Sequence, residues 1–268
     1  MQAIATPQAT HRPIVGFGDS LRSELCKLRS VRSTFWTLLA AVVFNVALAA
    51  LAAIFLPGQL SSEQKASVDP VQLSLAGLHL SQIAFGVLGV LVITSEYGTG
   101  MIRATLAAVP QRGLVLTAKA IVFAATALLV GIVSSFAAYF VFQAFLSDDS
   151  LKSSIGDPGV LRAVTGGGLY LTMLGLLGLG LGTIIRHSAG AIAALFGLLF
   201  VPPIFMGLLP PSWQTTIGPY IPMRAGEQIY ILRSHEAGLG AWPGFGVFSL
   251  YAALALTVGF ALINHRDA

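Results

Sequence analysis

The sequence predicts an all-α membrane protein in which six transmembrane helices form one domain. Three observations lead to this fold class. Hydrophobic residues make up 55% of the 268 residues and charged residues only 10%, the mean hydropathy is +0.81, and apolar runs long enough to cross a bilayer recur along the chain. A soluble domain carries about 25% charged residues. We therefore expect a single transmembrane domain over residues 19–268, preceded by a disordered cytoplasmic segment over residues 1–18.

The first ordered element that we expect is an amphipathic helix at the membrane surface. The stretch DSLRSELCKLRSVRS, residues 19–33, places leucines on one helical face and most of its basic residues off that face. Asp19 or Ser20 is the candidate N-cap. The alternative is a solvated cluster of basic residues that only sets the orientation of the chain. The residues assigned to this interfacial helix are Leu21, Glu24, Leu25, Lys27, Leu28 and Arg29.

The transmembrane helices follow from the apolar runs. The first run, residues 34–56, has no charged residue and measures roughly 34 Å at about 1.5 Å per residue. Because a long segment precedes this run, we expect a retained anchor and not a cleaved signal peptide. The six expected spans cover about residues 34–56, 73–95, 118–146, 163–185, 188–209 and 242–263.

A polar and basic segment, EYGTGMIRATLAAVPQRGLVLTAK, separates the second and third spans at residues 96–119. The turn at residues 98–100 frees the backbone, apolar residues then recur at helical spacing, and Pro110 ends the pattern. This predicts a short amphipathic helix on the cytoplasmic side. We expect Glu96 to cap that helix and to pair with Arg103 or with a basic residue of the N-terminal helix. The alternative is a solvated carboxylate that only marks the membrane boundary.

The later spans carry two further features. Small residues on one face of the fourth span predict close packing against another helix, by default within the same chain. Pro202 and Pro203 interrupt the fifth span and predict a kink. The loop over residues 210–241 mixes apolar and charged residues and should be half-buried. The glycines assigned to helix packing are Gly168, Gly175, Gly178 and Gly182.

Charge counting predicts the orientation. On the side that holds both termini, 10 of the 15 Lys and Arg residues are found, against 5 on the other side. Since basic residues concentrate on the inner side of a membrane, we expect both termini in the cytoplasm. The basic residues lie between apolar spans and form no patch, so we expect no nucleic-acid partner.

The sequence lacks the motifs of an enzyme. It contains no G-x-x-x-x-G-K-[ST] loop for nucleotide phosphates and no catalytic or metal-ligand constellation, so we expect no catalysis and no cofactor or metal bound by this chain. The apolar spans hold hardly any ionisable group, which disfavours a carrier driven by an ion gradient. We expect Asn45 and Gln82, the polar residues inside spans, to form hydrogen bonds between helices.

Two stretches carry a resemblance to a known family. SELCKLRSVRSTFWTLL before the first span and TSEYGTGMIRATLAAVPQR after the second resemble the type-2 permeases of ATP-binding-cassette exporters. The match is specific over residues 23–39 and 94–119, although Met101 stands where Thr is commoner. The positions that match the family's pattern E-Y-x-x-G-x-I-R…P-x-R…K are Glu96, Gly100, Ile102, Arg103, Pro110, Arg112 and Lys119.

The resemblance implies how such a chain works. It implies a pair of permease protomers, identical or closely homologous, in the lipid of a bacterial plasma membrane, with cytosolic ATPase subunits that use ATP and Mg. It also implies that the N-terminal helix and the loop after the second span contact the ATPase, and that a polar outer gate lies between the fifth and sixth spans. We expect Pro202 and Pro203 to bend the fifth span where it opens toward that gate. The residues it assigns to ATPase coupling are Glu96, Tyr97, Gly100, Met101, Ile102, Arg103, Leu106, Pro110 and Arg112. The alternatives are a membrane partner that transports nothing, such as an immunity or assembly factor, and an ion-driven carrier.

Overall fold

The structure is a computed structural model that describes residues 16–109, 111–232 and 238–265. These residues form helices and no strand, and six of the helices are long and apolar enough to cross a membrane, which confirms the predicted fold class. The predicted disorder at the N-terminus falls largely on residues 1–15, and these lie outside the described residues, as does Pro110. The six long helices are α2 (Arg32–Phe55), α5 (Leu78–Gly98), α7 (Arg112–Phe145), α8 (Val160–Ile185), α9 (Ser188–Met206) and α12 (Ala241–His265).

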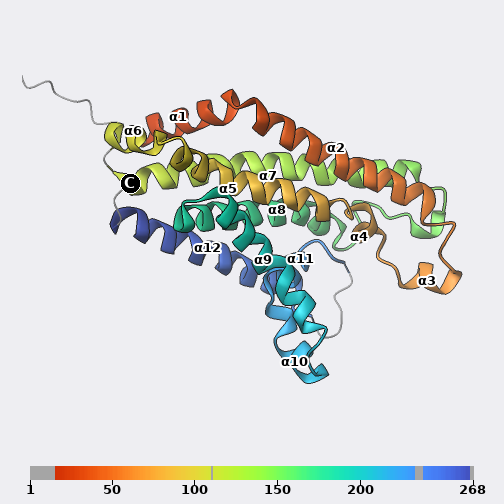
Figure 1. Cartoon of the computed structure of the whole chain (residues 1–268). Helices are drawn as coiled ribbons and strands as arrows, with labels where there is room; N and C mark the ends of the chain where they lie inside the picture. The colour runs from red at the N-terminus through yellow and green to blue at the C-terminus, as the bar shows by residue number, and fades with distance from the viewer. Residues whose placement is uncertain (1–15, 110, 233–237, 266–268) are drawn as a thin grey trace, which may run out of the picture.

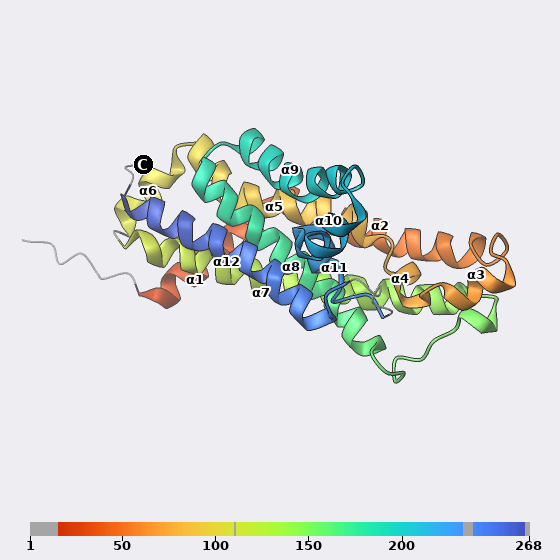
Figure 2. The same ribbon diagram turned by 90° about the horizontal axis from the view of Figure 1, so that it is seen from below.

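The long helices run side by side in an elongated bundle (Figures 1 and 2). At one end lie α1 (Phe17–Ser30), α6 (Met101–Ala108) and the last turns of α12. We call this the α6 end. At the opposite end lie α3 (Ser62–Ser67) and the chain between α7 and α8, with the short helix η1 (Asp149–Leu151). We call this the α3 end. The segments that the sequence assigns to one side of the membrane therefore gather at one end of the bundle.

Several predicted boundaries are wrong by a few residues. The N-terminal helix begins at Phe17, with Gly16 at the N-cap, because the Asp19 carboxylate accepts the Gly16 N–H from inside the first turn (3.2 Å). The second span begins at 78 and not at 73, because the short helix α4 (Pro70–Ser74) precedes it. The third span begins at Arg112 and not at 118, since nothing in residues 112–117 interrupts the helix.

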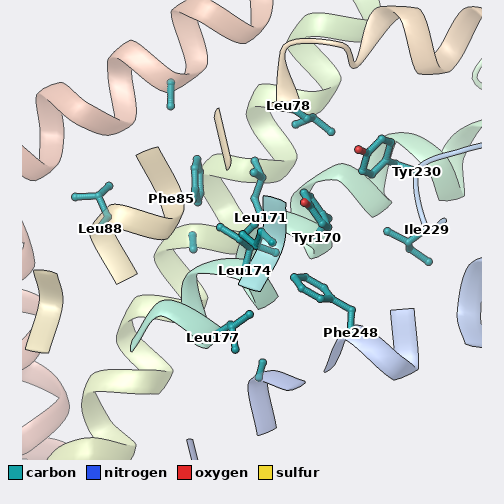
Figure 3. Close-up of a cluster of buried hydrophobic side chains, with 14 of the residues drawn as sticks. Leu78, Phe85, Leu88, Tyr170, Leu171, Leu174, Leu177, Ile229, Tyr230 and Phe248 are labelled. Atoms are coloured by element: carbon teal, nitrogen blue, oxygen red, sulfur yellow. The ribbon is translucent and has the colours of Figure 1, made fainter. Parts of the chain in front are cut away.

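Helix α8 is the centre of the bundle and the most enclosed of the long helices. It packs against α5, α7 and α12, and its large apolar side chains form the core with residues of α5 and α12 (Figure 3). Tyr170 stacks on Phe248 of α12 with ring centroids 5.3 Å apart. Its hydroxyl donates to Gln82 on α5 (2.6 Å). The predicted interhelical role of Gln82 is confirmed.

The predicted packing glycines lie where α8 meets its neighbours. A Cβ atom built on Gly168 would be 2.6 Å from the Ile132 backbone nitrogen on α7, and one on Gly178 would be 2.7 Å from the Gly86 carbonyl oxygen on α5. Gly175 and Gly182 are equally tight, with Cβ positions 2.5 Å from the Phe123 ring and 2.8 Å from Ile93, respectively. All four glycines therefore contact other helices of the same chain. Any larger residue would force the helices apart.

Asn45 links α2 to α7. Its side-chain amide donates to the Ser134 hydroxyl (2.9 Å), and both residues are buried. The predicted interhelical hydrogen bond of Asn45 is therefore confirmed. Gly77, just before α5, lies against the Asn45 backbone, where a Cβ atom would come within 2.5 Å. The second span can start at residue 78 because glycine allows this close approach.

The chain between α9 and α12 folds into α10 (Pro211–Thr216), η2 (Gly218–Tyr220) and α11 (Pro222–Glu227). As expected, the segment is only partly buried: Ile229 and Tyr230 are buried, whereas Trp213 and Tyr220 are exposed. Helix α9 itself continues through Pro202 and Pro203 to Met206. The kink at these prolines stays a prediction.

Candidate functional site

Four charged side chains meet at the α6 end, and we call them the ion cluster: Glu24 and Lys27 of α1, Glu96 of α5 and Lys119 of α7. Lys119 donates to Glu24 (2.5 Å) and to Glu96 (2.8 Å). Lys27 donates to the same two carboxylates, at 2.7 Å and 2.9 Å. The two positive and two negative charges cancel, so the cluster joins three helices without net charge.

The cluster is shielded from solvent to different degrees. The side chains of Lys119 and Glu96 are 2% and 3% exposed, that of Glu24 is 7% exposed, and that of Lys27 is 29% exposed. Burial alone would lower the pKa of Lys27, but its hydrogen bonds to Glu24 and Glu96 outweigh this and raise the pKa above the ordinary value. Lys27 is therefore a stable ammonium at neutral pH.

Local sequence explains why α5 ends beside α1. Glu96 lies in the last turn of α5, and Gly100 then adopts a left-handed backbone (φ +71°) that turns the chain into α6. Glycine takes this conformation without the penalty that other residues incur. In α6, Ile102 is buried as the apolar pattern predicts, but Met101, which belongs to the same predicted apolar face, is exposed. Leu106 is half-buried and Arg103 is exposed.

The pairing expected for Glu96, with Arg103 or a basic residue of the N-terminal helix, is confirmed, whereas the expected capping is wrong. Glu96 does pair with a basic residue of the N-terminal helix, Lys27, but its second partner is Lys119 and not Arg103. It does not cap α6, whose N-cap is Gly100 with no side-chain hydrogen bond. The boundary interpretation is wrong as well, since the Glu96 side chain is buried.

The other predicted residues surround this junction. Tyr97 lies under Arg186, the C-cap of α8, whose guanidinium carbon is 5.2 Å from the ring centroid. Arg112 donates to the Ile263 carbonyl oxygen near the end of α12 (3.2 Å). The end of α5 is thus joined to α8, while α7 is joined to α12.

The N-terminal helix turns a different face to the bundle than its leucines suggest. Glu24 is buried and Lys27 half-buried, while Leu25 is 43% exposed and Arg29 is also exposed. Leu21 and Leu28 are half-buried. Sequence reasoning missed the roles of Glu24 and Lys119 in the cluster. The available signal was that Glu24 and Lys119 each lie on an otherwise apolar helical face, where charged residues are rare unless they are paired.

A pocket of about 190 Å³ adjoins the cluster between α1, α2, α5 and α6. The four residues of the ion cluster line its charged end, Ser33, Thr34 and Ser95 add hydroxyl groups, and apolar side chains such as Leu88 and Leu91 line the rest. Among the described residues, no group of three or more His, Cys, Asp or Glu side chains is placed to hold a metal ion.

No family model matches this chain, and no curated protein matches it.

Proposed function

We propose that the chain is the membrane permease subunit of an ATP-binding-cassette exporter of the type-2 class. It would form the substrate pathway together with a second protomer, and a separate cytosolic ATPase would drive it. The family resemblance over residues 23–39 and 94–119 is one support. The six apolar helices and the surface helices α1 and α6 at one end of the bundle are the other.

The ion cluster is the observation that carries this proposal. A force applied by an ATPase to α1 or α6 must reach the spans through rigid contacts. Glu96 lies four residues before Gly100, where α6 begins, and it is bonded to α1 through Lys27 and to α7 through Lys119. The surface helices and two spans would therefore move as one body. In this proposal Pro202 and Pro203 bend α9 near the outer gate, and the plasma membrane holds the chain with both termini in the cytoplasm.

The test is a comparison of Glu96→Ala and Glu96→Gln with the unaltered chain, each purified with its ATPase subunit and reconstituted. We expect ATP hydrolysis to persist while transport falls, more for Ala because Gln keeps part of the acceptor capacity. Glu63→Ala, at an exposed glutamate of α3 at the opposite end of the bundle, is the matched control. Normal transport by Glu96→Ala at equal expression would remove the coupling role. Failure of any ATPase to co-purify would favour a membrane partner that transports nothing.

A further inference from the structure

The pocket beside the ion cluster combines an apolar wall with an unsatisfied polar end. Leu28, Val31, Leu88, Leu91 and Val92 line the wall. A space of about 190 Å³ exceeds by far what one water molecule needs. Leu91 and Met101 are both partly exposed, at 37% and 46%. The pocket therefore opens on the flank of α5, on the side from which an amphiphile in the bilayer would arrive.

The polar end has one acceptor and one donor available to a ligand. The Oε2 atom of Glu96 is buried and has no hydrogen-bond partner among the described residues. A buried carboxylate oxygen without a donor is costly, so a ligand that supplies one gains this energy. Glu96 is one of the residues that line the pocket, so a ligand bound there lies next to this carboxylate. Lys27 donates two N–H groups within the cluster, and its ammonium has three.

This arrangement selects a particular head group. A primary ammonium carries N–H donors for Glu96 Oε2, and a phosphate beside it accepts from the remaining N–H of Lys27. A trimethylated ammonium has no N–H and cannot satisfy the carboxylate. We propose that the pocket binds a phospholipid with a primary ammonium head, of the ethanolamine class, with the start of an acyl chain against Leu88 and Leu91. This proposal does not depend on an ATPase partner or on transport.

The test is lipid retention by the purified chain. Nanodiscs are made with equimolar ethanolamine and choline phospholipids of identical acyl chains, and the lipids that stay bound are counted by native mass spectrometry. We expect about a tenfold preference for the ethanolamine lipid, the value of one charge-assisted hydrogen bond. Equal retention of the two lipids would overturn the proposal.

Two variants localise the preference to the pocket. Leu91→Trp fills the pocket from its apolar wall, changes no charged residue, and should reduce the preference to none. Leu129→Trp, on the exposed face of α7, is the matched control and should keep it. A preference that survives Leu91→Trp, or that is lost equally in Leu129→Trp, would contradict the assignment.

Two further arms test the head group and the chain. Glu96→Gln replaces the carboxylate that would bind the lipid's ammonium with a neutral amide, so it should also abolish the preference. Thermal melting checks that the variant folds. If Glu96→Gln does not fold, Leu91→Trp still decides the outcome. Glycerophosphoethanolamine, which has the same head group without acyl chains, should not displace the lipid. Displacement by this soluble compound would overturn the lipid assignment in favour of a free ethanolamine phosphate.

Discussion

The two ends of the bundle use charged residues in different ways. At the α6 end, charged side chains bond to one another: Lys119 joins Glu24 to Glu96 and so connects three helices. At the α3 end, Lys65 and Asp148 also form an ion pair (2.7 Å), but it is partly exposed, and the more buried charged side chains bond to the backbone. Arg162 of α8 donates to the carbonyl oxygens of Ile229 (2.8 Å) and Ile231 (3.0 Å).

Asp69 completes the pattern at the α3 end. One carboxylate oxygen caps α4 by accepting the Val71 N–H (2.9 Å), and the other accepts the Leu232 N–H (2.8 Å). The first arrangement makes separate helices move together, whereas the second holds an irregular segment against the bundle by satisfying its main chain. The ion cluster therefore links whole helices, whereas Arg162 and Asp69 fasten residues 229–232 to the bundle.

The largest effect is expected from Lys119→Met. This change leaves two buried carboxylates with only Lys27 between them, and removing one member of a buried ion pair costs about 3 kcal/mol or more. Thermal melting in detergent measures the loss. The exposed pair of Lys152 and Asp149 is the control, and Lys152→Met should not shift the melting temperature measurably.

A double variant sharpens this prediction. Glu24→Gln combined with Lys119→Met removes one charge of each sign and should recover part of the stability lost in Lys119→Met alone. If Lys119→Met alone melts at the same temperature as the unaltered chain, the ion cluster adds no net stability.

Arg162→Met should have a smaller and more local effect. Methionine keeps much of the side-chain volume, but the carbonyl oxygens of residues 229 and 231 lose their donors, at a cost of about 2 kcal/mol. Hydrogen exchange should accelerate over residues 221–232 and not in α1. Arg22→Met is the control, because Arg22 lies on the exposed face of α1. Unchanged exchange in Arg162→Met would mean that packing of Tyr230 and Ile229 holds this segment without the arginine.

The smallest effect is a dependence on pH at α11. Burial raises the pKa of Glu227 above its ordinary value of 4.5, although His79, Tyr230 and Arg224 oppose the shift. Because the folded state binds the proton more tightly, protonated Glu227 stabilises the fold in full below about pH 4.5. This stabilisation is lost as the pH rises through the raised pKa of Glu227. Hydrogen exchange over α11 should therefore quicken across that interval.

Glu227→Gln separates the carboxyl group from its neighbours. After correction for the intrinsic pH dependence of amide exchange, hydrogen exchange over α11 should not change with pH in this variant. In the unaltered chain it should change as Glu227 ionises. A pH dependence that persists in Glu227→Gln would show that the Glu227 carboxyl group is not its source.

The sequence by itself determined the parts that depend on composition and local pattern. Long apolar runs must become helices in a bilayer because each backbone N–H and C=O then finds a partner inside its own segment. The six spans and the short helix after Gly100 could be predicted for that reason. The glycines of the fourth span predicted that another helix packs closely against it, because small residues allow close packing whichever helix is the partner.

Only the tertiary structure decided which charges meet. Glu24 and Lys119 are 95 positions apart, and the spacing within either helix does not indicate a common partner. The leucines of the N-terminal helix suggested that its apolar face would pack, yet Glu24 and Lys27 turn inward because Glu96 and Lys119 neutralise them there. A buried charge is tolerated only where the fold brings its counter-charge, and that condition depends on the packing of α1, α5 and α7 together.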